Sequence, residues 1–420
     1  MQALPPRQSR RSWVRHEEAG PRSPTQDGPR DSTRGRIRRI SAFQPGVVMH
    51  VGYATIFQNP HNALTDREVW QREVAMALQA EPLGFDSVWT VEHHFTDYTM
   101  SPDPLQFLSY IAGKTERVKL GSMVIVLPWH DPVRVAEQIS VLDHVSDGRM
   151  ILGFGRGLGK VEYDGFRISM DEGRSRFVEY AELVLNGLEN GYVEGGDTLQ
   201  QPRRDIRPRP FKTFKGRTYA AAVSPESMDI MARLGVGLLV IPQKPWDVVA
   251  KDFEDYHGVW QQVNPGTTPP KPLCGGFVFV DENEDRALTL GTEYVSAYYH
   301  TAMQHYEMTA EHFGKAKGYE FYSNVGRFIG RHGAEGAAAD FAKLMPIGTP
   351  DQVLEKVQFI RDTIDINGFM AQTSYAGMPW DEAERNLQCF AKHVLPELKK
   401  WDTGDLSEPA DLPLAMAAGA

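Results

Sequence analysis

Short apolar runs alternate with longer amphipathic stretches along the chain from residue 49 onward. The apolar runs predict eight strands, at residues 49–57, 85–92, 118–127, 150–155, 218–223, 237–242, 273–280 and 368–374. Strands that alternate with helices are typical of repeated βα units. Eight units over about 350 residues favour one closed (β/α)8 TIM barrel of the α/β class over an open doubly wound sheet.

The stretches between these strands have the periodicity of helices. Thr65 followed by Glu68 forms a capping box, which predicts the start of the first helix. We expect helices at residues 65–80, from about 104, and at 132–146, 174–188, 225–235, 246–263, 350–366 and 380–400. The segment between the helix at 174–188 and Pro210 is polar and rich in proline, so we expect no long helix or strand there. Residues 283–347 are mostly helical and exceed one crossover, which predicts a lid-like insertion after the seventh strand.

Composition separates the ends of the chain from its body. Residues 1–47 are rich in Arg and Pro and lack an apolar period, so we expect a disordered extension, followed by a barrel domain over 48–402 and a flexible tail over 403–420. Ten Arg and four acidic residues in 1–48 give +6, against −10 for the whole chain, which leaves −16 for the rest. An acidic body repels phosphate backbones and anionic lipids, so the charge argues against nucleic-acid or membrane binding.

The two cysteines indicate a reducing compartment. Cys274 and Cys389 lie far apart, with no CxxC pair. No window approaches the roughly 18 apolar residues that a membrane span needs, and the N-terminus lacks the apolar stretch of a secretory signal. We therefore expect a cytoplasmic protein.

Ionisable residues follow the second predicted strand, where the active site of a barrel lies. Glu92, His93 and His94 are consecutive. His titrates near neutrality and a neighbouring carboxylate can fix its tautomer, so the run predicts acid–base chemistry. The alternative is that one His packs beneath a loop and the other is solvated.

A metal site is not expected from the spacing of the histidines. Adjacent His residues on an extended segment point to opposite faces, and no third ligand stands at a recognised distance along the chain. His300, His305 and His312 match no ligand template, so they are expected on a helix surface.

A glycine-rich turn and a helix start suggest an anion site. Residues 153–159 carry Gly at alternate positions around Arg156, a bidentate phosphate donor, but do not match GxGxxG. Ser224 precedes Pro225 at a helix start, where free N–H groups attract anions. With Arg174 these residues would form a phosphate pocket. The alternative is a flexible turn and an ordinary helix cap.

Several separated motifs, taken in order, resemble one family. They are FDSVW (85–89), EHHF (92–95), GSMVIVLPWHDPVRVAEQISVLDHVSDGRMILGFGRGL (121–158), GYEFYSN (318–324) and IGTPDQVLEKV (347–357). Together they are similar to the bacterial luciferase-like flavin-dependent monooxygenases over about 49–400. The resemblance implies a (β/α)8 barrel that binds reduced FMN at the C-terminal ends of the strands.

The resemblance also implies roles for individual residues. His93 matches the histidine assigned as catalytic base or proton donor, His94 is its neighbour, and Glu92 matches a residue beside the isoalloxazine; we take these three as the catalytic set. The residues matched to the flavin ring are Met123, Val124 and Leu158, and those matched to its phosphate are Arg156, Arg174, Val223, Ser224 and Ser227.

Two positions depart from the luciferase catalytic subunit. Gly155 stands where that subunit has a reactive Cys, which is expected to leave room over the flavin ring, and Val223 stands where it has an acidic residue. Met123–Val124 occupies the place of its non-proline cis peptide. The retained His pair and Gly-Arg-Gly turn resemble the catalytic subunit rather than the non-catalytic one.

The expected function is oxygenation of a small apolar substrate, such as an aldehyde or ketone, by reduced FMN and dioxygen. The expected apolar wall of the site consists of Trp89, Trp129, Phe57 and Phe95. Lack of a nicotinamide fingerprint indicates that a separate flavin reductase supplies the cofactor, and the resemblance implies a homo- or heterodimer. The alternatives are a deazaflavin- or NAD(P)H-dependent oxidoreductase of the same superfamily, or a non-catalytic flavin-binding partner subunit.

Overall fold

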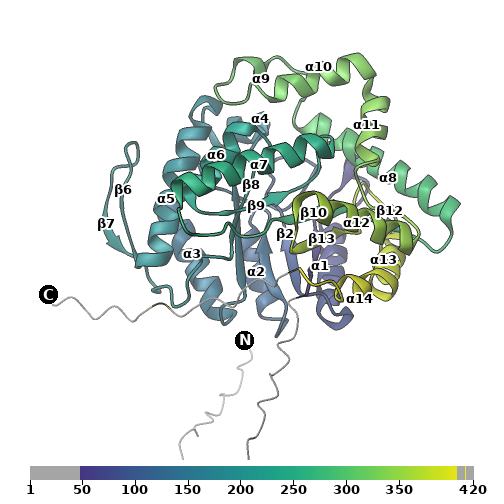
Figure 1. Ribbon diagram of the computed structural model, residues 1–420, viewed down its shortest axis with the longest axis horizontal. Helices are drawn as coiled ribbons and strands as arrows, with labels where there is room; N and C mark the ends of the chain where they lie inside the picture. Colours follow the sequence, from purple (N-terminus) through teal and green to yellow (C-terminus); the bar gives the residue numbers. More distant parts are fainter. Residues whose placement is uncertain (1–47, 404–411, 413–420) are drawn as a thin grey trace, which may run out of the picture. The chain divides into compact units, whose positions relative to one another are not determined.

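The chain folds into a closed barrel of eight parallel strands (Figure 1). The computed structural model describes residues 48–403 and Leu412, so the extension expected at 1–47 and most of the expected tail lie outside the described residues. The barrel strands are β1 (His50–Thr55), β2 (Ser87–Thr90), β3 (Lys119–Ser122) with its continuation β4 (Ile125–Val126), β5 (Met150–Gly155), β8 (Thr218–Ala221), β9 (Gly237–Val240), β10 (Leu273–Phe277) and β13 (Gly368–Gln372). β1 pairs with both β2 and β13, and β3 pairs with β5, which closes the ring. The expected TIM barrel is confirmed.

Helices follow the strands as the amphipathic pattern predicts. They are α1 (Asp66–Leu83), α2 (Pro104–Ala112), α3 (Pro132–Val145), α5 (Gly173–Asn190), α6 (Pro225–Leu234), α7 (Trp246–Val263), α12 (Pro350–Ile364) and α13 (Trp380–Cys389), with the last continued by a π-helical turn (Phe390–Val394) and α14 (Leu395–Leu398). Both halves of the expected capping box at Thr65 and Glu68 are present. No helix of the described residues is both long and apolar enough to cross a membrane.

Two short elements lie where the sequence pattern predicts none. Helix α4 (Lys160–Phe166) follows β5, and its N-cap Gly159 has no side chain with which to cap it. The antiparallel hairpin of β6 (Tyr192–Gly195) and β7 (Gln201–Asp205) fills the polar excursion before β8. Neither element carries a strong periodic signal, because β7 is almost wholly polar and α4 spans only two turns.

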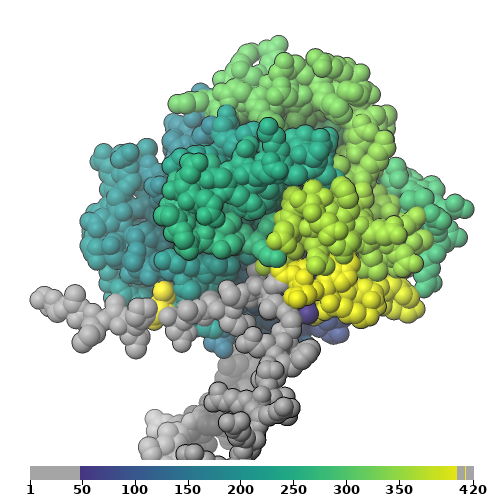
Figure 2. Space-filling view, in the orientation of Figure 1, coloured from purple at the N-terminus to yellow at the C-terminus, as the bar shows by residue number. Residues whose placement is uncertain are grey.

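The long segment after β10 forms a helical excursion. It contains α8 (Glu284–His305), α9 (His312–Lys315), α10 (Tyr322–His332) and α11 (Ala334–Ala342), and it is bounded by the paired strands β11 (Phe279–Val280) and β12 (Ile347–Gly348). In Figure 1, α9 and α10 lie along the top of the molecule above α4. The space-filling view shows the same light-green segment at the upper edge, against the teal part of the chain (Figure 2).

Glycines on the inner face of the barrel make room for one tryptophan. Tyr53 packs outward against Phe85, in the loop between α1 and β2, so its neighbour Gly52 faces the barrel axis. A Cβ on Gly52 would lie 2.6 Å from the Trp89 ring, and one on Gly121 would lie 2.2 Å from it. Trp89 therefore fills the barrel core between β1 and β3 and does not line a pocket at the mouth.

A buried histidine completes this core. Trp89 Nε1 donates to Ser87 Oγ at 2.6 Å, and Ser87 Oγ lies 2.7 Å from His50 Nε2. When the Ser87 hydroxyl donates to Nε2, this nitrogen carries no proton and the imidazole is neutral, as its burial favours. Burial lowers the pKa of His50 from its ordinary 6.5 to about 4.

This depressed pKa of His50 predicts acid sensitivity. Below about pH 6.5 the unfolded chain takes up a proton on His50, whereas the folded chain does so only near pH 4, so lowering the pH favours unfolding. We expect His50 to account for a loss of about 3 kcal/mol in the free energy of unfolding between pH 7 and pH 4. Urea unfolding of the wild type and His50→Gln at several pH values measures it. The exposed His61→Gln is the control, and parallel pH profiles for wild type and His50→Gln would contradict the assignment.

Candidate functional site

The residues expected at the site gather at the C-terminal ends of the barrel strands. Glu92 follows β2, the Met123–Val124 peptide joins β3 to β4, and Arg156 follows β5. The Met123–Val124 bond is cis, as the resemblance implies. Since all the barrel strands are parallel, these residues share one end of the barrel.

The room expected at Gly155 is already filled. A Cβ on Gly155 would lie 2.6 Å from Val124 Cγ2. The isopropyl group of Val124, directly after the cis bond, therefore takes the space that a larger residue at 155 would need. The expectation that Gly155 opens space over the ring is wrong, because the neighbouring strand compensates for the missing side chain.

Glu92 is a buried anchor with three donors. Its Oε1 accepts from His130 Nε2 at 2.6 Å and from His94 Nε2 at 3.1 Å, and its Oε2 accepts from the Val126 N–H at 2.8 Å. Burial alone would raise the pKa of Glu92, but the hydrogen bonds from His130 and His94 and the charge of His130 bring it below its usual value. Burial alone would lower the pKa of His130, but the hydrogen bond to Glu92 and the charge of Glu92 outweigh burial and raise it. Glu92 thus holds the β2 loop against the segment after the cis bond.

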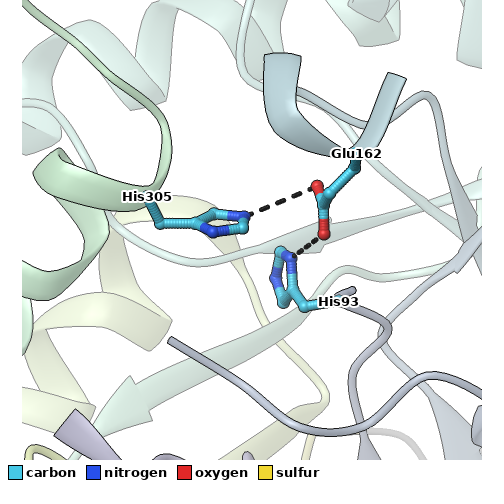
Figure 3. Close-up of side chains that lie close together, drawn as sticks. All are labelled: His93, Glu162 and His305. Atoms are coloured by element: carbon cyan, nitrogen blue, oxygen red, sulfur yellow. Dashed lines mark hydrogen bonds and ion pairs between the residues drawn. The ribbon is translucent and has the colours of Figure 1, made fainter. Parts of the chain in front are cut away.

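His93 points the other way, toward a carboxylate that the sequence analysis did not single out. His93 Nδ1 points at Glu162 Oε1 on α4 (Figure 3), 3.0 Å away. His93 Nε2 lies 3.4 Å from the Tyr306 hydroxyl. Glu162 Oε1 also accepts from the His94 N–H at 2.9 Å. Burial raises the pKa of Glu162, yet His93 and His305 lower it to about 2, so the carboxylate is ionised.

His305 joins the same group from the end of α8. Its Nε2 lies 3.5 Å from Glu162 Oε2, an ion-pair separation without hydrogen-bond geometry, and its Nδ1 lies 2.9 Å from Thr96 Oγ1. The residue is 6% exposed, so the expected helix-surface position of His305 is wrong. No spacing in the sequence connects residues 93, 162 and 305; only their approach in the fold does.

Aromatic rings surround the histidine pair, but they are not all the expected ones. The His94 ring lies edge-on to the rings of Phe166 and Trp129, with ring centres 4.7 Å and 5.5 Å away. The Trp129 ring stacks on the Phe166 ring, with a distance of 5.7 Å between their centres. Of the other rings expected in the wall, Phe57 packs outside the barrel against α1 and α2, and Phe95 is 60% exposed. Phe166 is the wall residue that the sequence analysis missed.

A pair of arginines shares one acceptor in a second part of the site, which we call the cationic end. Arg156 Nη1 donates to the Gly318 carbonyl at 2.7 Å, and Arg174 Nη2 donates to the same oxygen at 3.0 Å. The Arg156 guanidinium lies 3.9 Å from the centre of the Tyr319 ring. Gly318 and Tyr319 both lie in the loop between α9 and α10. The fold therefore brings together two cations that are separated in the sequence.

The expected helix start lies beside these arginines. Arg174 Nη2 also pairs with Glu226 Oε2 at 3.0 Å, in the first turn of α6. Ser224 caps this helix by accepting from the Ser227 N–H at 3.3 Å, and the two hydroxyl oxygens are 2.8 Å apart. The Val223 carbonyl accepts from Lys244 Nζ at 2.8 Å, which adds a cation that the sequence analysis missed. Leu158 is half-buried against the core.

Comparison with known proteins identifies the family. The model of the luciferase-like monooxygenases matches residues 49–365. The chain belongs to the luciferase-like monooxygenase family. It is 24% identical over 352 residues to the alkanal monooxygenase alpha chain of Photorhabdus luminescens, which covers 82% of this chain and 95% of that one. These findings make the protein an oxidoreductase of this superfamily.

Solved structures share the fold of this luciferase-like protein. The monooxygenase RslO1 from Streptomyces bottropensis is 26% identical, with a TM-score of 0.64 over 83% of this chain and 99% of that one. The oxygenating constituent of 3,6-diketocamphane monooxygenase from Pseudomonas putida, solved with FMN, is 16% identical with a TM-score of 0.61, covering 84% and 99%. An F420-dependent secondary alcohol dehydrogenase is 14% identical with a TM-score of 0.62, covering 83% and 99%. The last two likenesses show the fold alone.

The anchor role of Glu92 predicts a large loss of stability on truncation. Glu92→Ala leaves His94, His130 and the Val126 N–H without their buried acceptor, so we expect the free energy of unfolding to fall by about 3–5 kcal/mol. Urea unfolding at pH 7 measures the change. The exposed Glu182→Ala on α5 should change it by less than about 0.5 kcal/mol. Similar losses in both variants would show that Glu92 does not hold the mouth of the barrel.

Proposed function

We propose that the protein oxygenates a small apolar organic substrate, such as an aldehyde or ketone, with reduced FMN and dioxygen. The observation that carries this proposal is the division of the site: the Arg156 and Arg174 pair at one end and the His93–Glu162 pair at the other. The Met123–Val124 peptide lies at the same end of the barrel. Two cations in one part of the site and a histidine–carboxylate pair in another match a ligand that has an anionic tail and a reactive ring.

The cationic end fits the phosphate of FMN. The two arginines already converge on a single oxygen, the Gly318 carbonyl, as they would on a phosphate oxygen. The start of α6 adds backbone N–H groups and the Ser224 and Ser227 hydroxyls. These residues would hold the phosphate, and the Met123–Val124 segment and Leu158 would contact the ring. Reduced FMN, when bound, supplies the two electrons that reduce dioxygen.

His93 is the proton-handling group in this proposal. With Nδ1–H donating to Glu162, the ring orientation is fixed and Nε2 is left for the reacting side, next to the Tyr306 hydroxyl. Glu162 is a positioning residue, because it acts through His93. The rings of Trp129 and Phe166 around His94 exclude water from this end. One oxygen atom enters the substrate and the other leaves as water.

The helical excursion after β10 acts as a lid over both ends. It supplies Tyr306 and His305 beside His93, and Gly318 on the arginine pair. A lid that completes the site also excludes water during turnover. Reduced flavin comes from a separate reductase, and the enzyme is a homo- or heterodimer.

A deazaflavin-dependent dehydrogenase is the second candidate, favoured by the fold shared with the F420-dependent alcohol dehydrogenase. The two candidates differ in their use of oxygen. Incubation with reduced FMN, a panel of aldehydes and ketones, and isotopically labelled dioxygen should put one labelled oxygen atom into the product. Oxygen-independent turnover with a deazaflavin would support the dehydrogenase instead. No turnover with either cofactor, with FMN still bound, would indicate a non-catalytic partner subunit.

Arg156 should matter for cofactor affinity. Arg156→Ala removes a charged hydrogen bond to the phosphate, so we expect FMN binding to weaken by about 1–3 kcal/mol. Fluorescence titration of FMN measures the change. Arg176→Ala is the matched control, because Arg176 lies on α5 with Arg174 but pairs with Glu172 at the surface. Equal affinities for wild type and Arg156→Ala would remove Arg156 from the phosphate site.

His93 should matter for the chemical step rather than for cofactor binding. His93→Ala removes the proton-handling group, so we expect the oxygenation rate to fall by roughly 10²–10⁴-fold, with FMN affinity unchanged. Product formation under excess reduced FMN is the measurement. His300→Ala, a change at a half-exposed position on α8, should leave the rate unchanged. Undiminished product formation in His93→Ala would refute the role given to His93.

A further inference from the structure

Glu162 and His305 carry two buried polar atoms without hydrogen-bond partners among the described residues. The atoms are Glu162 Oε2 and His305 Nε2. The two atoms face each other (Figure 3). They are 3.5 Å apart, and the Glu162 and His305 side chains are 0% and 1% exposed. A buried donor or acceptor without a partner is unfavourable, because it has lost its hydrogen bonds to water. Two such atoms side by side indicate that a further group belongs between them.

The Thr96 contact leaves Nε2 as the ring nitrogen of His305 that faces Glu162. In the tautomer whose Nδ1–H donates to Thr96 Oγ1 at 2.9 Å, Nε2 carries a lone pair, as the imidazole of a metal ligand does. An imidazole nitrogen and a carboxylate oxygen that face each other in a buried place are the kind of atoms that bind a transition-metal ion.

His93 supplies the third ligand atom. His93 Nδ1 lies 3.0 Å from Glu162 Oε1, and one ligand atom from each of the three residues lies within 4.8 Å of the other two. Ligand atoms that bind one zinc ion at about 2.0–2.1 Å in a tetrahedron lie roughly 3.4 Å apart. The 3.0 Å from His93 Nδ1 to Glu162 Oε1 and the 3.5 Å from His305 Nε2 to Glu162 Oε2 are each close to this separation, so each histidine faces its own oxygen of the carboxylate.

We propose that His93, Glu162 and His305 form a binding site for one divalent transition-metal ion, with zinc as the ion it fits. Two imidazoles and a carboxylate are a zinc ligand set, with one position left open. The hard ions Mg²⁺ and Ca²⁺ prefer oxygen ligands. Tyr306 at His93 Nε2 and Thr96 at His305 Nδ1 are the outer hydrogen-bond partners that metal-binding histidines require.

Occupation of this site engages His93 Nδ1, the atom that otherwise donates to Glu162. If the proposed function holds, a bound ion therefore inhibits oxygenation by taking His93 out of the reaction. The metal site itself does not depend on that function, so binding and inhibition are measured separately.

Titration of the full-length, metal-free protein with Co²⁺ tests the site directly. We expect one equivalent of Co²⁺ to give the visible absorption bands of a low-coordinate nitrogen and oxygen site. Zn²⁺ should abolish these bands and a large excess of Mg²⁺ should not. Absence of the bands, or their loss with Mg²⁺, would overturn the proposal.

Variants then locate the ion. His305→Gln removes one ligand and should weaken Co²⁺ and Zn²⁺ binding by more than about tenfold, whereas His300→Gln on the same helix should bind like the wild type. Thr96→Val keeps all three ligands and should weaken binding by about tenfold; it serves as the second variant if His305→Gln does not fold, which circular dichroism and thermal melting check. Wild-type affinity in both His305→Gln and Thr96→Val would place the ion elsewhere and refute the site.

The activity assay separates this site from the proposed function. Zn²⁺ at saturating concentration should inhibit wild-type oxygenation, and inhibition in Thr96→Val should need about tenfold more Zn²⁺. Tight, His305-dependent binding without inhibition would keep the metal site and refute the role of His93 in the reaction. Inhibition of wild type and Thr96→Val at the same Zn²⁺ concentration would refute the link between this site and the inhibition.

Discussion

Two ionised carboxylates buried at the mouth of the barrel determine how the site is built. A carboxylate out of contact with water needs several donors, and Glu92 and Glu162 obtain them from different parts of the chain. Glu92 binds His94, His130 and a backbone N–H of β4, whereas Glu162 binds His93 and the His94 N–H and faces His305. The two consecutive histidines thus point to opposite carboxylates, which fixes the β2 loop between them. Loss of either carboxylate would free one histidine of the pair.

The helical excursion after β10 completes the site at both ends. Its helix α8 brings His305 and Tyr306 to His93, and the loop before α10 places the Gly318 carbonyl on Arg156 and Arg174. One inserted segment therefore contacts the His93–Glu162 pair and the arginine pair together. Under the proposed function, a phosphate at the arginines would compete with the Gly318 carbonyl for the same donors, which would link cofactor binding to the position of the excursion that contacts His93.

Much of the fold and part of the site could be predicted, and the failures share a cause. The eight strands, the insertion and the convergence of Arg156 with Arg174 follow from apolar runs and from the polar residues that end them. The room expected at Gly155 is taken by Val124, and the expected ring wall lacks Phe57, which packs outside the barrel. These errors concern packing between elements, because the volume around a residue depends on side chains that the local pattern does not specify.

The sequence by itself determined the order of strands and helices, the cap at Thr65 and Glu68, and the place of Glu92, His93 and His94 at a strand end. All of these depend on residues within one turn or one strand of each other. Only the tertiary structure decided the partners of the histidines: His93 meets Glu162 across 69 residues, and Thr96 meets His305 across 209. Such pairs arise when barrel closure and the excursion after β10 bring distant segments into contact. Periodicity records which face of an element is buried, but not which residue it is buried against.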